Sequence, residues 1–176
     1  MSKKRLYIAY GSNLNLTQMA HRCPTAKPVG TAAIKGYELL FRGDEYRGVA
    51  TIEPREGSTV PVLLWDIKQK DETALDRYEG YPSLYGKQMM DVELDGKPVS
   101  AMVYVMTPGH GIGYPSQHYL DIIADGYMSA GFDPSILDAA IRRTDEIIAQ
   151  ELEELATEYD YEQGYGQGPL YDLHWW

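Results

Sequence analysis

The segment 75–82 places one carboxylate where its proton affinity should be perturbed. Glu79 falls in the last turn of a helix that is expected to begin near Asp71 and to end at Gly80. The partial negative charge of a helix C-terminus opposes a carboxylate, and loss of water to aromatic neighbours acts in the same sense. Those neighbours in the sequence are Tyr78, Tyr81 and Tyr85. A raised pKa would suit Glu79 to general acid/base work near neutral pH, whereas the alternative is a solvated surface glutamate.

A second segment, Tyr10-Gly11-Ser12-Asn13-Leu14, joins an apolar strand directly to a helix. Consecutive backbone N–H groups at such a junction favour an anion, and a glycine lets a ligand approach the main chain. Ser12 lacks the Gly-x-Ser-x-Gly surroundings of a hydrolase nucleophile. The alternative interpretation is a plain strand-to-helix turn in which Asn13 or Asn15 caps the helix.

Other combinations of residues indicate no metal or nucleotide site. The four histidines and the one cysteine show no ligand spacing on a shared helix; they are His21, His110, His118, His174 and Cys23. The glycine-rich run 109–113 lacks the third glycine of a dinucleotide-binding loop and is expected to be a turn. Because Cys23 has no partner for an internal disulfide, a reducing, cytoplasmic setting is expected.

Charge and composition limit the classes of partner. The chain has 176 residues, one domain's worth, and a net charge of -10, which argues against nucleic acid and anionic membranes as partners. The acidity is uneven, because residues 1–143 carry -1 and the last 33 residues carry -9. The first apolar run, 6–10, is too short for a signal peptide or a membrane span. Fifteen tyrosines suit a pocket wall or a wet interface.

The hydrophobic pattern predicts an α+β domain with a curled or barrel-like sheet. A short helix is expected from Leu14 to Pro24, and Asp95-Gly96 predicts a hairpin. The expected strands cover 5–10, 30–41, 47–52, 60–67, 88–94 and 98–107. A further helix is expected from Ser116 until Gly131, and Asp133-Pro134 should open the last one.

The last predicted helix, 134–157, has an apolar stripe. The stripe consists of Leu137, Ile141, Ile148, Leu152 and Leu155. Intramolecular packing is the simpler role for it, and a surface for a protein partner is the alternative. The aromatic and acidic tail, 159–176, has no predicted structure, so the expected domain covers 1–158.

Five segments in the same order resemble the γ-glutamylcyclotransferase-like (AIG2-like) family over about residues 6–130. They are Tyr10-Gly11-Ser12-Asn13-Leu14, Gly48-Val49-Ala50-Thr51-Ile52, Leu75-Asp76-x-x-Glu79-Gly80, Tyr104-Val105-Met106-Thr107 and Pro115-Ser116-x-x-Tyr119. The resemblance implies a small mixed β-barrel with flanking helices and a cavity at one end. It also implies a small γ-glutamyl substrate and no cofactor.

The resemblance assigns roles to particular residues. The acid/base glutamate of the family matches Glu79, and its glutamyl-binding loop matches Tyr10, Gly11, Ser12, Asn13 and Leu14. The family's pocket tyrosines match Tyr85, Tyr104 and Tyr119, although the spacing from Glu79 to Tyr85 is shorter than in vertebrate enzymes. The implied reaction is attack of the substrate's α-amine on its own γ-carbonyl, which releases 5-oxoproline and an amine or amino acid.

Three functions remain open from the sequence. The first is γ-glutamylcyclotransferase activity with Glu79 as acid and base. The second is the same chemistry on γ-glutamylamines, and the third is a non-catalytic module that binds a small acidic metabolite. The sequence does not name the leaving group, and it leaves a homodimer open.

Overall fold

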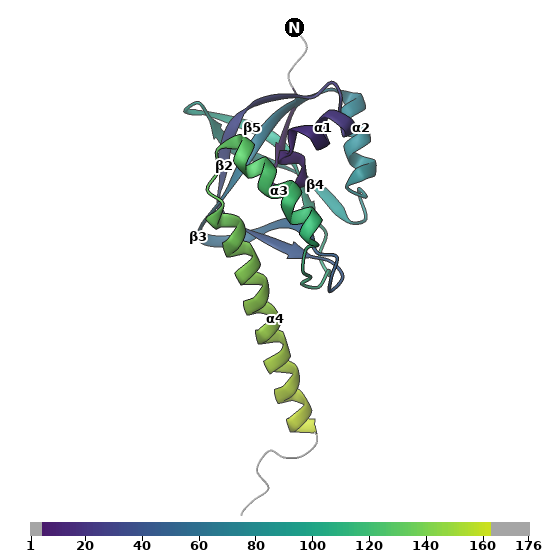
Figure 1. Cartoon of the computed structure of the whole chain (residues 1–176), viewed down its shortest axis with the longest axis vertical. Coiled ribbons are helices and arrows are strands. Elements are labelled where there is room, and N and C mark those ends of the chain that lie inside the picture. Colours follow the sequence, from purple (N-terminus) through teal and green to yellow (C-terminus); the bar gives the residue numbers. More distant parts are fainter. Residues whose placement is uncertain (1–4, 163–176) are drawn as a thin grey trace, which may run out of the picture. The chain divides into compact units, whose positions relative to one another are not determined.

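The computed structural model describes residues 5–162 of the chain. Within these residues, five strands and four α-helices form an α+β arrangement (Figure 1). The strands are β1 (Arg5–Ala9), β2 (Lys27–Arg42), β3 (Val49–Ile67), β4 (Tyr85–Leu94) and β5 (Lys97–Met106). The helices are the 3-10 turn η1 (Ser12–Leu14), α1 (Leu16–Arg22), α2 (Gln69–Tyr78), α3 (Gln117–Ala130) and α4 (Ser135–Glu162).

The strands form one mixed sheet in the order β2-β3-β1-β5-β4. Strand β1 is parallel to β5, while the β1–β3, β2–β3 and β4–β5 pairs are antiparallel. Within residues 5–162 the edge strands β2 and β4 are not hydrogen-bonded to each other, so the sheet is open. The predicted barrel is therefore wrong, although the mixed sheet with flanking helices is present.

The sheet gathers several strand ends in one place. Because β1 and β5 are parallel, their C-terminal ends lie side by side, and the antiparallel pairing of Tyr85 with Met106 brings the start of β4 to the same end. The start of β3 also reaches this region, since a Cβ atom on Gly11, just after β1, would lie 3.0 Å from the Cβ of Ala50. Residues far apart in the sequence thus meet at one end of the sheet.

Strand β3 corrects the sequence expectation of two separate strands. The stretch 53–59 is polar, contains a proline and a glycine, and is largely exposed, which is why it suggested a loop. It stays extended because it pairs with β2, across a register shift between Lys35 and Tyr37 where Gly36 takes a positive φ of 77°. The predicted hairpin at Asp95-Gly96 is confirmed, with φ of 49° and 74° at its two turn residues.

Side-chain and glycine caps set the limits of the helices. Asn15 caps α1 by accepting from the Gln18 N–H at 3.1 Å, and Ser116 caps α3 by accepting from the Tyr119 N–H at 3.2 Å. The expected cap of α2, Asp71, instead lies inside its first turn and accepts from the Lys68 N–H at 2.9 Å. The helix therefore begins two residues earlier than predicted.

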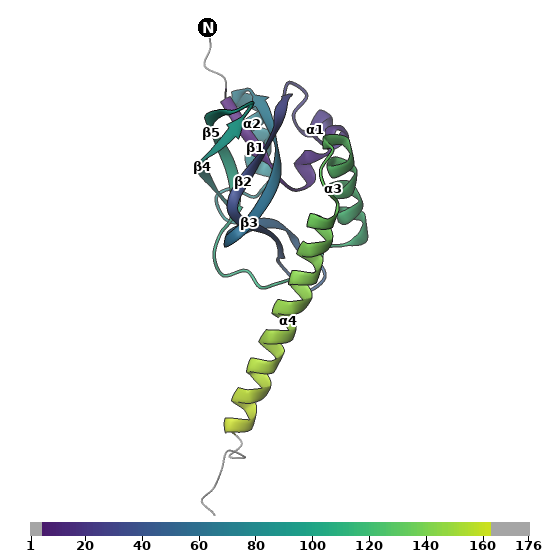
Figure 2. The same ribbon diagram turned by 90° about the vertical axis from the view of Figure 1, so that its left-hand side faces the viewer.

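Helix α3 packs directly on the loop that follows β1, and Figure 2 shows α1 and α3 on the same side of the sheet. A Cβ atom at Gly126 would lie 2.6 Å from the Leu14 Cβ and 3.0 Å from the Asn15 nitrogen. The Asn15 side chain also donates to the Ile122 carbonyl at 3.1 Å. This close packing fixes the loop against a rigid helix.

Residues from Asp145 onward form a separate compact unit from Met1–Thr144. The predicted apolar stripe is divided accordingly. Leu137 is buried in the first unit, whereas Leu152 and Leu155, in the second, are each 62% exposed. The predicted tail beyond residue 162 lies outside the described residues. Among the helices within 5–162, none is long and apolar enough to span a membrane.

Substitution of Gly126 by alanine should destabilise the fold. Alanine normally stabilises a helix relative to glycine by about 1 kcal/mol, but here the methyl group would overlap Leu14 and Asn15. We expect Gly126→Ala to lower the free energy of unfolding by about 1–3 kcal/mol in urea denaturation. Met128→Ala, at an exposed position of the same helix, should change it by less than about 0.5 kcal/mol. An unchanged or higher stability for Gly126→Ala would contradict the close packing.

Candidate active site

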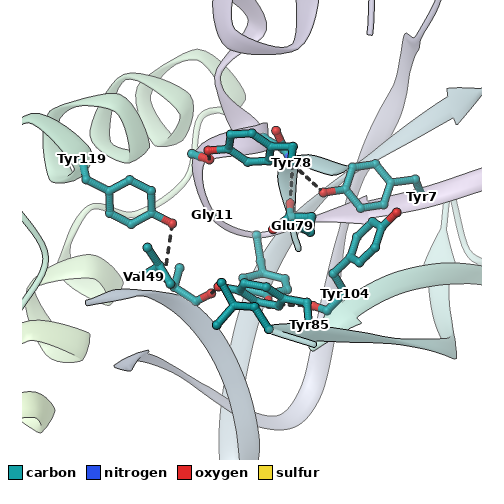
Figure 3. A pocket seen from close by; sticks show the side chains of 13 residues that line it. Tyr7, Gly11, Val49, Tyr78, Glu79, Tyr85, Tyr104 and Tyr119 are labelled. Carbon is teal, nitrogen blue, oxygen red and sulfur yellow. Dashed lines mark hydrogen bonds between the residues drawn. The ribbon is translucent and has the colours of Figure 1, made fainter. Parts of the chain in front are cut away.

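A small cavity of about 180 Å³ lies where the strand ends meet. Its lining residues come from six segments: the end of β1 with the loop after it, and the ends of β3, α2, β4, β5 and α3 nearest to that loop. They are Tyr7, Tyr10, Gly11, Ser12, Asn13, Val49, Ala50, Tyr78, Glu79, Leu84, Tyr85, Tyr104 and Tyr119. Figure 3 shows Glu79 between Tyr78 and Tyr85, with Tyr7 and Tyr104 on one side and Tyr119 on the other.

The Glu79 carboxyl has an unusually high proton affinity. Glu79 caps the C-terminus of α2, where its N–H bonds to the Leu75 carbonyl at 2.8 Å and Gly80 follows with a φ of 63°. Burial raises the pKa of Glu79 to about 7, against the opposing effects of the Arg22 charge and an Asn13 hydrogen bond. The direction agrees with the sequence expectation, and the largest cause is the loss of water.

Asn13 connects Glu79 to the rest of the site. Its Nδ2 donates to Glu79 Oε1 and to the Tyr7 hydroxyl, both at 2.9 Å. Its Oδ1 accepts from the Arg22 guanidinium at 2.7 Å. The Asn13 main-chain carbonyl accepts from Trp65 Nε1 at 3.1 Å. Every polar group of the Asn13 side chain therefore has a partner inside the protein.

The loop after β1 presents main chain to the cavity. The Leu14 N–H bonds to the Gly11 carbonyl at 3.0 Å, which closes the 3-10 turn. The first N–H groups of such a turn, those of Ser12 and Asn13, have no acceptor within the turn itself. At Gly11 any side chain would press on Ala50, and the Tyr119 hydroxyl lies 3.5 Å from the position of a Cβ. Glycine keeps this wall of the cavity open.

Main-chain contacts orient three of the tyrosine hydroxyls. Tyr10 donates to the Tyr104 carbonyl and Tyr85 donates to the Ala50 carbonyl, both at 2.6 Å. The Tyr119 hydroxyl accepts from the Ala50 N–H at 3.1 Å. Burial raises the pKa of each of these phenols above its ordinary value, so they stay neutral.

Tyr104 belongs to a different network. Its hydroxyl donates to Asp76 Oδ1 at 2.5 Å, and Asp76 forms an ion pair with Lys87 at 2.7 Å. Lys87 also contacts Glu72 at 2.6 Å. Burial, followed by the hydrogen bond to Asp76, raises the pKa of Tyr104. Its ring packs edge-on against Tyr7, with centroids 5.8 Å apart.

The structure brings together nearly all the residues singled out in the sequence. The nine that line the cavity are Glu79, Tyr10, Gly11, Ser12, Asn13, Tyr78, Tyr85, Tyr104 and Tyr119. Leu14 does not line it and is fully buried in the hydrophobic core. Tyr81 also lies elsewhere, 43% exposed, with the Lys87 ammonium 4.6 Å from its ring centroid.

Other residues of the cavity carried no recognised function in the sequence. Tyr7 belongs to an apolar strand, so the sequence did not indicate that its hydroxyl faces the cavity. Leu84 lies in the loop between α2 and β4. Val49 and Ala50 belong to a segment that pointed to the family but not to the site. Arg22 gave only a weak indication, a cation in the last turn of a short helix.

These features suit proton transfer more than metal or nucleotide chemistry. A partly buried carboxyl with a pKa of about 7 can both take and return a proton near neutral pH. Neutral phenols and the loop N–H groups can hold a small polar ligand beside it. Within residues 5–162, no three His, Cys, Asp or Glu side chains are grouped so that they could hold a metal ion.

Comparison with known proteins points to one family. The family model described as "Gamma-glutamyl cyclotransferase, AIG2-like" matches residues 7–127. The chain is 31% identical over 136 residues to the gamma-glutamylcyclotransferase of Bos taurus and 31% identical over 138 residues to that of Homo sapiens; each match covers 72% of this chain and 71% of the relative. A solved structure named gamma-glutamyl cyclotransferase superposes with a TM-score of 0.70 at 26% identity, covering 78% of this chain and 86% of the other.

The raised pKa of Glu79 predicts a pH-dependent stability difference for Glu79→Gln. Between about pH 4.5 and 7 the folded wild type holds more protons than the unfolded chain, so its stability falls as the pH rises. Glutamine cannot ionise, and its amide oxygen can still accept from Asn13. We expect Glu79→Gln to exceed wild type in free energy of unfolding by about 1–3 kcal/mol at pH 8 and to match it near pH 4.5.

Denaturation curves at several pH values measure this difference. Glu93→Gln, at an exposed position of β4, is the matched loss of one carboxylate and should not reproduce the trend. A difference between Glu79→Gln and wild type that stays constant from pH 4.5 to 8 would show that Glu79 titrates normally.

Proposed function

The chain belongs to the γ-glutamylcyclotransferase, AIG2-like family, and we propose that it is a cyclotransferase that converts a small γ-glutamyl compound into 5-oxoproline and a free amine or amino acid. The observation that carries the proposal is the Glu79 carboxyl, which faces the cavity with a pKa raised by burial to about 7. A module that only bound a metabolite would gain little from such a group.

The proposed reaction is an intramolecular acyl transfer. The α-nitrogen of the glutamyl group attacks its own γ-carbonyl carbon, a new C–N bond closes a five-membered ring, and the original C–N bond to the leaving group breaks. The α-ammonium begins with three protons and the lactam nitrogen keeps one. The other two end on the departing nitrogen, which leaves as an ammonium group. No oxidant, metal or cofactor is needed to balance the reaction.

Glu79 is the proposed carrier of one of these two protons, and the other moves from the ring nitrogen to the departing amine through solvent. As a carboxylate it takes a proton from the α-ammonium, which frees the nitrogen lone pair for attack. As a carboxylic acid it returns the proton to the leaving nitrogen when the tetrahedral intermediate collapses. A pKa near 7 keeps both forms populated near neutral pH, so one group serves both steps.

The cavity would supply geometry and electrostatic support. Because the nucleophile is tethered to the carbonyl, folding the glutamyl chain into its attack conformation removes most of the entropic barrier. The ring of tyrosines supplies walls for that conformation. The N–H groups of Ser12 and Asn13 and the Tyr119 hydroxyl are proposed to hold the α-carboxylate or the oxyanion that develops on the γ-carbonyl oxygen.

Glu79→Gln tests the proposal directly, because it keeps the shape of the side chain and removes its acid/base function. With γ-glutamyl dipeptides as substrates, we expect 5-oxoproline release to fall at least 100-fold, the lower limit typical of a lost general base. Glu93→Gln should retain wild-type turnover. Release by Glu79→Gln at the wild-type rate would contradict the assignment of Glu79.

The choice of substrates separates the alternatives left open by the sequence. A panel of γ-glutamyl amino acids and γ-glutamylamines, including γ-glutamyl-lysine, varies only the leaving group, so the relative kcat/KM values identify the class that the chain prefers. Calorimetric titration with 5-oxoproline tests the binding module. Binding of 5-oxoproline by a wild-type protein that turns over no member of the panel would favour the module and contradict the cyclotransferase.

A further inference from the structure

Arg22 does not line the cavity, yet it is connected to Glu79 through one side chain. We propose that Arg22 is a positioning residue that locks the Asn13 side-chain amide with its NH2 group toward Glu79 and thereby holds Glu79 ready to act as a base. The inference rests on the proposed function of Glu79 for its kinetic consequences. Its structural part concerns only the three side chains and can be tested without turnover.

The Arg22 guanidinium is held in place from several sides. It is the last residue of α1, where a cation is favoured by the helix dipole. It donates to Asn13 Oδ1 at 2.7 Å, to Ser12 Oγ at 3.1 Å and to Gln18 Oε1 at 2.8 Å. Its Cζ also lies 3.7 Å from the centroid of the Tyr78 ring, so the planar group stacks on an aromatic face.

Donor and acceptor chemistry then dictates how the Asn13 amide is oriented. A guanidinium has donors only, so the Asn13 oxygen must be the atom that faces it. The NH2 group consequently faces the cavity, where its two hydrogens go to Glu79 and Tyr7. If the amide were reversed, an NH2 group would face the donors of Arg22 and an oxygen would face Glu79.

The orientation matters because it selects one protonation form of Glu79. An N–H donated to a carboxyl group favours the carboxylate, whereas an amide oxygen in the same place would favour the protonated acid. The positive charge of Arg22 acts in the same direction as the donated N–H, and both oppose the burial that raises the pKa of Glu79. Arg22 thus limits the rise in the pKa of Glu79, so that a fraction of the carboxyl remains ionised at neutral pH and can act as a base.

The other groups that surround Glu79 do not replace this effect. Apart from Arg22 of α1, the titratable groups that act on it or are acted on by it are phenols from four elements of the cavity, while β3 contributes only Val49 and Ala50. They are Tyr7 and Tyr10 of β1 and its loop, Tyr85 of β4, Tyr104 of β5 and Tyr119 of α3. The pKa of each is raised, so they stay neutral near pH 7 and contribute no positive charge.

A lysine at position 22 should be an imperfect replacement. Its ammonium keeps the charge but is a compact donor without a planar fork, so it cannot reproduce the stacking on Tyr78 together with bonds to Ser12, Asn13 and Gln18. Methionine keeps much of the aliphatic length and removes both the charge and the donors. The pair R22K and R22M therefore separates charge from orientation.

The experiment follows Glu79 itself by carboxyl carbon NMR on the full chain labelled with ¹³C-glutamate, in which the Glu79 signal is identified by its absence from E79Q. The acidic limb of kcat/KM for a γ-glutamyl dipeptide is measured in parallel. We expect R22M to move both to higher pH by about half a unit or more, which lowers kcat/KM at pH 6 roughly threefold or more. R22K should move them in the same direction by less.

R77M is the matched control, since Arg77 also lies in the last turn of its helix, is exposed, and is only two residues from Glu79 in the sequence. It should leave both readouts at their wild-type pH. A wild-type Glu79 titration in R22M, or an equal shift in R77M, would overturn the inference. If R22M does not fold, R22K decides, and an unshifted Glu79 signal in R22K overturns it. Absence of turnover in wild type would refute the proposed function alone, because the NMR titration would still report on Arg22.

Discussion

The hydrogen bond from Asn13 Nδ2 to Glu79 Oε1 joins the two chain segments on which the candidate site depends, and the Ser12 and Tyr78 hydroxyls form a second bond between them at 3.1 Å. One partner lies in the turn after β1 and the other lies at the end of α2, 66 residues apart in the sequence. The carboxyl is buried enough for its pKa to rise to about 7, and a buried carboxyl without a donor would be costly to ionise. The hydrogen bond makes the ionised form accessible inside a cavity walled by tyrosines.

Close main-chain packing keeps these two segments in register. Gly11 allows the loop to lie against Ala50 of β3, and Gly126 allows α3 to lie against Leu14 and Asn15. The fully buried Leu14 side chain anchors the same turn in the core. One short turn therefore carries both residues that line the cavity and a residue of the core, so the stability of the core and the geometry of the site are coupled.

Local patterns were sufficient to predict several parts of this arrangement. The glycine stop after Glu79, the Asp95-Gly96 hairpin and the helix after Ser116 each depend on a few neighbouring residues, and all are present. Of the two expected caps of the first helix, Asn13 and Asn15, the structure has Asn15. The continuity of β3 could not be predicted, because its exposed polar stretch 53–59 is kept in the strand by the pairing of Glu53, Pro54 and Thr59 with β2. Whether the sheet closes likewise depends on whether β2 and β4 form hydrogen bonds to each other, which no local pattern encodes.

The candidate site shows the same division between local and long-range information. Glu79 and the loop were recognisable because their chemistry follows from their own position at a helix end or after a strand. Three other features depend on tertiary packing: the contact of Arg22 with Asn13, the inward-facing hydroxyl of Tyr7 and the burial of Leu14 in the core.

Packing also determines which side chains change their charge near neutral pH. Burial raises the pKa of the phenols Tyr7, Tyr10, Tyr85, Tyr104 and Tyr119 away from neutrality and brings that of Glu79 to it. The same desolvation therefore has two different consequences for function. It keeps the tyrosines protonated, so that they act as neutral hydrogen-bonding groups that line the cavity. It also brings the pKa of the Glu79 carboxyl close to neutral pH, where a group can both take up and release a proton.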